Sequence, residues 1–162
     1  MWMNAAEVAF LRAEAVAVFG FTGMGGTAKD FYERGIELSF EQWGAGSAVD
    51  YINNATSKPG IYDDPSGANS YGSQLSTITV KWNEGDTPDV KQERIITQKW
   101  IANWMLGNEA WADFRRTGYP RLIPADPAGN KSGGVVDNEL GARRMPFPTD
   151  EYVSNKANVE AA

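Results

Sequence analysis

The feature that most constrains the fold is a pair of consecutive helix-forming segments between Thr87 and Gly118, with Gly107 separating them. Thr87 followed by Pro88 is typical of a helix start, because the hydroxyl caps the first turn and proline needs no hydrogen bond there. The first segment runs to about Leu106, and its apolar residues spread over roughly half of its circumference. Such a wide stripe predicts a helix that is packed on several sides.

Three tryptophans lie in these segments, at Trp100, Trp104 and Trp111. Indole rings can stack on sugars, but these three lie at helical spacing among isoleucine and methionine, which favours a core position. Three exposed indoles would also form a large apolar patch. We therefore predict that all three are largely buried.

Two more helices are predicted near the amino terminus. Asn4 is a typical cap for the first, whose apolar spacing ends at Gly20. Thr27 caps the second, which extends to about Trp43. The second helix has the small-aromatic-small spacing of a tetratricopeptide hairpin, at Ala28, Tyr32 and Gly35.

The rest of the chain is mostly irregular. A short third helix is predicted at about 48–54, and residues 55–72 have the Gly, Pro, Ser, Asn and Asp content of a loop. Residues 78–82 alternate apolar with polar side chains, which indicates a short strand or an extended segment. A final turn is predicted at 150–153. The fold class is therefore all-α, mostly helical with long loops.

Charge and composition exclude several partners. The net charge is −6, and the basic residues are scattered or paired, so neither a nucleic acid nor an anionic membrane surface is expected as a partner. No apolar run approaches the roughly 20 residues that a membrane-spanning helix requires. The chain has no cysteine, so neither a disulfide framework nor thiol chemistry is expected.

The chain also lacks histidine, which excludes catalytic units of the Ser-His-Asp and Cys-His types. Asp63 and Asp64 are possible glycosidase carboxylates, but adjacent aspartates point in different directions, and solvated loop residues are the better interpretation. Residues 63–69 are rich in oxygen ligands without the spacing of an EF-hand loop. We therefore expect no catalytic residue, no metal site and no cofactor.

Loop aromatics are the candidate ligand-binding residues. Tyr62, Tyr71 and Trp82 occur where little apolar sequence is available to cover them. Asn69 and Asn83 lie beside them, and amide groups both donate and accept hydrogen bonds. Flat rings with neighbouring amides suit a carbohydrate, and rings that pin the loop to the helices are an alternative of equal weight. Two second-rank candidates lie at the ends of predicted helices, Trp43 and Tyr51.

Two arginine pairs, Arg115–Arg116 and Arg143–Arg144, suit either an anionic ligand or structural ion pairs. The first pair lies in the last turn of a predicted helix, where it complements the helix dipole. The chain also offers many glutamates as partners. Structural ion pairs are therefore the favoured interpretation for both.

The order of these motifs resembles that of a known family. Residues 95–104 and 107–120 match, almost letter by letter, the signature of the SusD/RagB cell-surface nutrient-binding lipoproteins. Three further segments match the family in the same order, at 6–14, 25–40 and 143–158. The resemblance therefore spans nearly the whole chain.

The resemblance implies a tetratricopeptide-like helical superhelix, of which residues 1–162 form the C-terminal portion of a single domain. The amino-terminal half and the lipoprotein signal would lie outside this chain. The full protein would be attached to the outer face of a Bacteroidetes outer membrane through its lipid anchor. It would capture an oligosaccharide for a SusC-like TonB-dependent transporter and break no bond.

Three alternatives to an oligosaccharide-binding protein stay open. The first alternative is a peptide ligand, because some relatives serve peptide uptake. Hairpin spacing alone suggests a helical protein-interaction scaffold, and two carboxylates facing each other across a cleft would suggest a glycosidase.

Overall fold

The computed structural model describes residues 3–67, 70–127, 129–142 and 145–161. Asn69, Arg143 and Arg144 lie outside the described residues. Within the described ranges the chain forms helices and two isolated β-bridges but no strand, which confirms the all-α prediction. The chain divides into two compact units, Met1–Ile123 and Pro124–Ala162.

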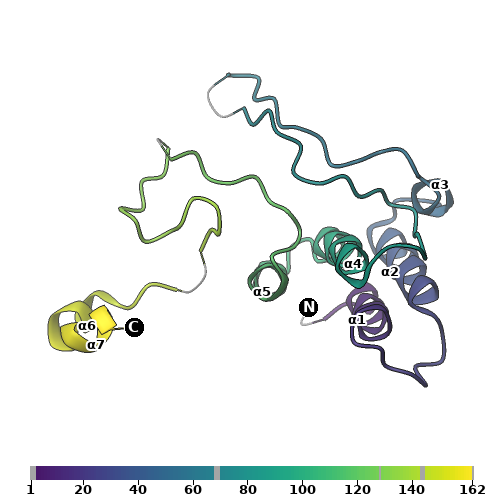
Figure 1. The fold of residues 1–162 in the computed structure, drawn as a ribbon, viewed down its shortest axis with the longest axis horizontal. Coiled ribbons are helices and arrows are strands. Elements are labelled where there is room, and N and C mark those ends of the chain that lie inside the picture. Colours follow the sequence, from purple (N-terminus) through teal and green to yellow (C-terminus); the bar gives the residue numbers. More distant parts are fainter. Residues whose placement is uncertain (1–2, 68–69, 128, 143–144, 162) are drawn as a thin grey trace. The chain divides into compact units, whose positions relative to one another are not determined.

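The first unit holds the larger helices. Three of them, α1, α2 and α4, pack against one another, and α5 follows α4 after a short turn (Figure 1). With the short α3 included, the helices of this unit are α1 Ala5–Ala17, α2 Ala28–Trp43, α3 Val49–Ile52, α4 Pro88–Ala102 and α5 Gly107–Thr117.

Local side chains fix where these helices begin. The Asn4 side chain accepts a hydrogen bond from the Glu7 backbone N–H at 2.6 Å, which caps α1 as predicted. At α2, Thr27 and Asp30 exchange side-chain and backbone hydrogen bonds in a capping box, and the backbone N–H of Thr27 lowers the pKa of Asp30. Thr87 caps α4, with Pro88 at its first position.

The core of this unit centres on Tyr32, which is fully buried. Its ring lies edge-on to Phe10, with 6.1 Å between centroids, and 5.2 Å from the ring of Trp82. The Tyr32 hydroxyl donates to the carbonyl of Val80 at 2.6 Å, and burial raises the pKa of Tyr32. The tyrosine therefore joins the α1–α2 hairpin to the loop segment that precedes α4.

Gly35 allows the two helices of the hairpin to approach closely. A Cβ atom at this position would lie 2.8 Å from two ring atoms of Phe10, which is itself fully buried. We expect Gly35→Ala to lower the unfolding free energy by about 0.5 to 2 kcal/mol, because overpacking outweighs the gain in helix propensity. Urea unfolding of the full-length protein measures this change.

Gly72→Ala is the matched control for that experiment. A Cβ atom at Gly72 would meet no atom within 4 Å, and its backbone conformation is open to other residues. We expect Gly72→Ala to leave the unfolding free energy unchanged or to raise it by up to about 1 kcal/mol. Equal effects of the two substitutions would contradict the close approach at Gly35.

Residues 78–82 form no strand, and the chain bends at Val80 and Lys81. Their backbone groups are bound elsewhere, since the Lys81 N–H donates to the carbonyl of Asn54 at 2.9 Å and Arg94 binds the carbonyls of Thr79 and Lys81. The strand form of the prediction is therefore wrong.

The second unit contains two short helices, α6 Thr149–Ser154 and α7 Lys156–Ala161, where the sequence predicts one turn. Ahead of them, the Asn130 side-chain amide donates to the carbonyl of Val136 at 2.8 Å and to Asn138 Oδ1 at 2.7 Å. These bonds organise residues 130–138 without regular secondary structure.

Candidate functional site

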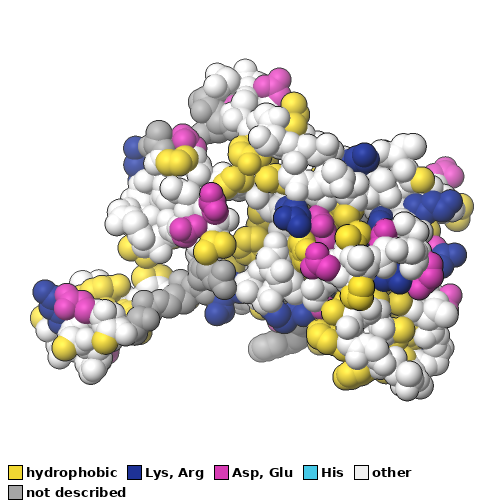
Figure 2. Space-filling model, in the orientation of Figure 1, with side chains coloured by type: hydrophobic (Ala, Val, Ile, Leu, Met, Phe, Trp, Pro, Cys, Tyr) yellow, Lys and Arg dark blue, Asp and Glu magenta, His cyan; other side chains and the backbone are white. Residues whose placement is uncertain are grey.

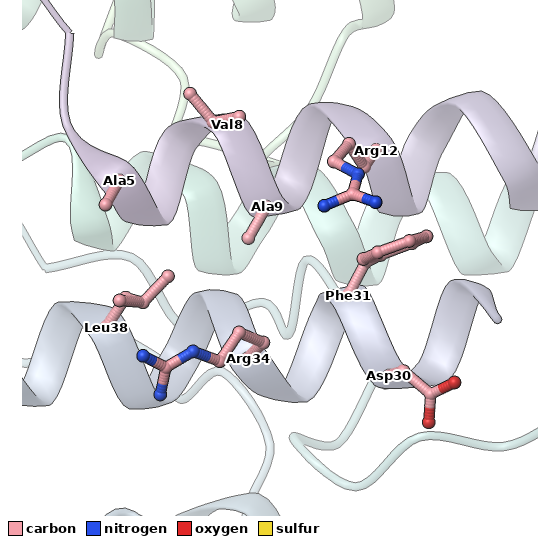
Figure 3. Close-up of a pocket in the computed structure, with 8 residues that line it drawn as sticks. All are labelled: Ala5, Val8, Ala9, Arg12, Asp30, Phe31, Arg34 and Leu38. Carbon is pink, nitrogen blue, oxygen red and sulfur yellow. The ribbon is translucent and has the colours of Figure 1, made fainter. Parts of the chain in front are cut away.

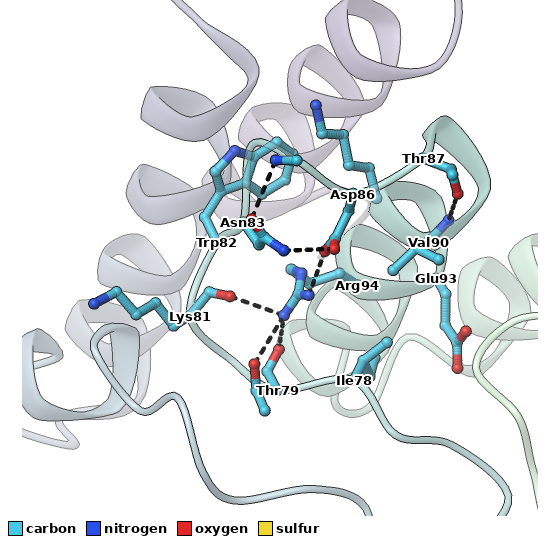
Figure 4. A network of polar contacts seen from close by, with 12 residues as sticks. Ile78, Thr79, Lys81, Trp82, Asn83, Asp86, Thr87, Val90, Glu93 and Arg94 are labelled. Carbon is cyan, nitrogen blue, oxygen red and sulfur yellow. Dashed lines mark hydrogen bonds and ion pairs between the residues drawn. The ribbon is translucent and has the colours of Figure 1, made fainter.

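A long loop, residues 55–87, extends away from the helices and returns to the start of α4 (Figure 1). Arg94 of α4, only 4% exposed, holds the returning arm (Figure 4). Its guanidinium donates to the carbonyls of Thr79 and Lys81 and pairs with Asp86 at 2.6 Å. This buried charge fixes where the arm lies against α4.

Trp82 does not offer its ring to a ligand. It is 6% exposed and lies between the ring of Tyr32 and the Lys91 ammonium, which is 5.7 Å from the indole centroid. The indole N–H donates to Glu84 at 2.6 Å and, with Lys91, lowers the pKa of that carboxyl group. The prediction of an available stacking ring is therefore wrong for Trp82, which pins the loop to the helices.

The Asn83 side chain is engaged in a turn. Its amide nitrogen donates to Asp86 Oδ1 at 2.7 Å, and its oxygen accepts from the Gly85 N–H at 3.1 Å (Figure 4). These contacts position Asp86 for Arg94. The structure thus gives Asn83 a local structural role.

Tyr62 and Tyr71 are brought together. They form an antiparallel bridge in which each N–H donates to the other's carbonyl, at 3.1 and 2.7 Å. Side chains of a directly opposed pair project to the same face. Tyr62 is 46% exposed and Tyr71 is partly buried, so this pair remains a candidate aromatic surface.

The acidic residues between these tyrosines serve the loop itself. Asp64 accepts from the backbone N–H and the hydroxyl of Ser66, and the Ser70 hydroxyl donates to Asp63 at 3.1 Å. Among the residues that the structure describes, no group of three or more acidic side chains is placed to hold a metal ion.

A groove of about 390 Å³ lies between the returning arm, α4 and the segment that follows α5. This volume is within the range of sites for small ligands. Trp100, Ile101 and Leu122 supply an apolar wall, and the Trp100 side chain is 39% exposed. Several polar side chains also line the groove, namely Ser57, Lys58, Thr79, Gln98 and Arg121.

Internal contacts position the polar side chains of the groove. The Tyr51 hydroxyl donates to Gln98 Oε1 at 3.0 Å. Buried Glu93 accepts from the Ser76 hydroxyl at 2.5 Å and from Arg121 Nε at 3.2 Å. An aromatic face beside fixed amide and hydroxyl groups suits a sugar, which presents apolar C–H faces and rings of hydroxyls. Of the sequence-predicted candidates that fall within the described residues, only Tyr51 lines this groove.

A second hollow, of about 420 Å³, lies between α1 and α2 (Figure 3). Ala5 and Ala9 leave space for it, while the guanidinium of Arg12 lies 3.9 Å from the ring centroid of Phe31. Because Arg12 covers that ring, no aromatic face is open here for stacking.

Within residues 1–162, the three tryptophans are not buried as predicted. Trp104 is 65% exposed, Trp100 is 39% exposed and Trp111 is partly buried. The reason is that α4 packs through other positions within this chain, including Ile95 and Ile96, which are fully buried. The apolar stripe of α4 is wider than the surface that α1 and α2 cover.

The exposed indoles border a hollow of about 440 Å³. We define its lining as the tryptophan face, which consists of Trp100, Asn103, Trp104, Met105, Gly107, Ala110, Trp111, Phe114 and Leu122. Asn103 is its single polar side chain and is 2% exposed. Trp100 and Leu122 also line the groove, so the two surfaces adjoin.

A buried ion-pair network joins α1, α4 and α5. Lys99, 3% exposed, lies 2.8 Å from Asp113 and 3.4 Å from Glu7. Arg116 binds Glu14 with both amino groups, at 2.6 and 3.0 Å, and Asp113 at 2.9 Å. Its hydrogen bonds to Glu14 raise the pKa of Arg116.

The predicted structural role is thus confirmed for Arg116. Its neighbour Arg115 lies over Trp111 instead, with 4.6 Å between the guanidinium carbon and the ring centroid. Sequence reasoning missed Lys99, whose partners lie on two other helices.

Charged side chains of both signs are interspersed on the face that Figure 2 shows, with dark blue and magenta groups side by side. This pattern agrees with the scattered basic residues of the sequence and with the net charge of −6. A nucleic-acid interface requires clustered cations, which this face lacks.

A family model described as "SusD-like: Susd and RagB outer membrane lipoprotein" matches residues 1–162. Among solved structures, a SusD homolog from Bacteroides uniformis is 65% identical, with a TM-score of 0.90, and the match covers 100% of this chain and 33% of that one. A homolog from Bacteroides thetaiotaomicron is 47% identical, with a TM-score of 0.85, covering 99% and 33%.

A structure described as a chitin-binding SusD homolog from Flavobacterium johnsoniae is 45% identical, with a TM-score of 0.83. The match covers 98% of this chain and 32% of that one. The chain therefore spans about a third of the length of these relatives. A comparison with curated proteins found no match.

Proposed function

Since the chain belongs to the SusD/RagB family of outer-membrane lipoproteins, we propose that its protein captures an oligosaccharide at the cell surface. The captured ligand then passes to a SusC-like TonB-dependent transporter. The observation that carries this proposal is the family match over residues 1–162, supported by a 45% identical relative described as chitin-binding. The ligand is bound and released without cleavage of a bond.

The proposed cellular location of the protein rests on the same family match. Within the described ranges no helix combines the length and the apolar character needed to cross a membrane. We propose that a lipid anchor outside residues 1–162 attaches the protein to the outer membrane, as the family description of an outer-membrane lipoprotein implies.

Within this chain, the groove beside Trp100 is the proposed contact with the sugar. Its aromatic wall and polar side chains match the two kinds of surface that a sugar ring presents. The tyrosine pair Tyr62 and Tyr71 is a second proposed contact, because both side chains project to one face of the loop. The tryptophan face lacks polar groups for sugar hydroxyls apart from buried Asn103.

Calorimetric titration of the full-length protein with chitin oligosaccharides, followed by other glycans, tests the groove. We expect Trp100→Ala to weaken binding of the recognised glycan by about fivefold or more, which corresponds to roughly 1 kcal/mol. The glycan should be recovered uncleaved after incubation, which chromatography of the mixture will check.

Trp43→Ala is the matched control, because Trp43 is 49% exposed at the end of α2 and does not line the groove. The control should bind like the wild type, with both variants folded by circular dichroism. Normal binding by Trp100→Ala would exclude the groove as the site. Binding of peptides but of no glycan would replace the oligosaccharide proposal with peptide uptake.

A further inference from the structure

The groove beside Trp100 is basic, although the chain as a whole is acidic. Its described lining residues include two basic side chains, Lys58 and Arg121, and no acidic one. The whole chain holds 21 acidic residues against 15 basic ones. A concave surface that carries only the less frequent charge favours a ligand of the opposite sign.

Arg121 is held in place while part of its guanidinium stays available. Its Nε donates to Glu93 at 3.2 Å, and its guanidinium carbon lies 5.4 Å from the centroid of the Tyr119 ring. Glu93 and Tyr119 are both 6% exposed, so buried groups make both contacts. Among the described residues, no hydrogen bond uses either terminal amino group of Arg121. These two groups form a fork that suits the paired oxygens of a carboxylate or a sulfate.

Lys58 supplies a positive charge that nothing in the groove offsets. Buried Glu93 compensates the charge of Arg121. Lys58, by contrast, is exposed and forms no ion pair with any residue that the structure describes. The backbone beside it is fixed, because the Ser57 N–H donates to the Asn54 side chain at 2.8 Å. The groove therefore has a net positive charge at a defined place on the loop.

On the basis of the proposed function, we infer that the groove selects an acidic glycan over a neutral one. The acidic substituent is an oxyanion, either the carboxylate of a uronic acid or a sulfate ester. The Arg121 fork binds this oxyanion, and the Lys58 ammonium adds attraction over a longer distance. The sugar ring lies against Trp100, the aromatic side chain of the groove wall.

Calorimetric titration of the full-length protein with acidic and neutral oligosaccharides tests this inference. The acidic ligands are fragments of polygalacturonate, hyaluronan and chondroitin sulfate, and the neutral ones are fragments of chitin and cellulose. Each acidic ligand that binds is then compared with its own neutral form. Carboxyl reduction neutralises the uronic acids and desulfation removes the sulfates, so the two treatments distinguish the two oxyanions. We expect the loss of the recognised oxyanion to weaken binding by about tenfold, because charge-assisted hydrogen bonds are lost.

Two substitutions identify the cations. We expect Arg121→Gln to weaken binding of the acidic glycan by about tenfold and Lys58→Gln by about threefold, because a bidentate contact exceeds a single exposed charge. Both variants should bind the neutral form within about twofold of the wild type, since uncharged sugar gains little from a cation. Lys81→Gln is the matched control, because Lys81 is exposed on the same loop and does not line the groove. It should bind both forms like the wild type.

Equal affinities for an acidic glycan and its neutral form would overturn the inference and leave the proposed function intact. Binding of neutral glycans alone would do the same. If Arg121→Gln weakens binding of both forms equally, then Lys58→Gln decides, and an unchanged preference for the acidic form in that variant contradicts the inference. Binding of no glycan at all would contradict the proposed function itself, so the two failures are distinguishable.

Discussion

Replacing Lys99 with methionine is expected to lower the unfolding free energy by about 3 to 5 kcal/mol, the range for breaking a buried ion pair. The ammonium group lies between Glu7 and Asp113, both at most 5% exposed. Methionine keeps the length of the side chain but leaves Glu7 buried without its cation and Asp113 with Arg116 alone. Urea unfolding of the full-length protein measures the loss.

Lys29→Met is the control for this substitution. Lys29 pairs with Glu33 at 3.7 Å on the surface of α2, and its side chain is 54% exposed. Exposed pairs of this type contribute at most about 1 kcal/mol. Adding Glu7→Gln to Lys99→Met should restore part of the stability, since one unpaired charge is removed. A loss below about 1 kcal/mol for Lys99→Met would contradict the structural role of the network.

Replacing Arg94 with methionine is expected to have the second-largest effect, a loss of about 3 kcal/mol. The substitution leaves Asp86 without its cation and two carbonyls of the returning arm without their donor. Because this arm forms one wall of the groove, glycan binding should weaken together with stability. Hydrogen exchange of residues 76–86 should accelerate, which mass spectrometry measures.

Arg34→Met controls for the loss of an arginine. Arg34 pairs with Glu37 and Glu41 at 2.9 Å on the surface, and its side chain is 48% exposed. We expect Arg34→Met to change the unfolding free energy by less than about 1 kcal/mol and to leave hydrogen exchange in the loop unchanged. If the loop of Arg94→Met exchanges at the wild-type rate, then other contacts hold the arm, such as the bond from Tyr32 to Val80.

The helices of this chain could be predicted from its sequence because their signals are local. The Thr27 cap places the start of α2 at Ala28, and the predicted end at Trp43 agrees with the structure. The Thr87-Pro88 start of α4 is likewise confirmed. Capping depends on neighbouring residues, so it needs no knowledge of tertiary contacts.

Burial could not be predicted in the same way. Trp82 lies where little apolar sequence is available to cover it, yet its ring packs against Tyr32 from a distant helix. Conversely, Trp104 has apolar neighbours in sequence but none of this chain's helices covers it. Periodicity shows which side of a helix is apolar, and it does not show what lies against that side.

The groove gave no sequence signal for a related reason. Its walls come from α3, from the loop on both arms, from α4 and from the segment after α5. Each contributes one or a few ordinary residues, such as Gln98 and Arg121. Lys99 is similar, because a lysine within a helix shows nothing of the acidic partners that two other helices supply.

The depth of the ion-pair network has a consequence for ionic strength. Dissolved salt screens exposed charges over about 8 to 10 Å at ordinary concentrations, but it screens buried pairs much less. Surface pairs such as Lys29–Glu33 therefore weaken as the medium becomes more saline, while the Lys99 contacts persist. The contacts that join α1, α4 and α5 therefore keep their strength when the salt concentration of the surroundings changes.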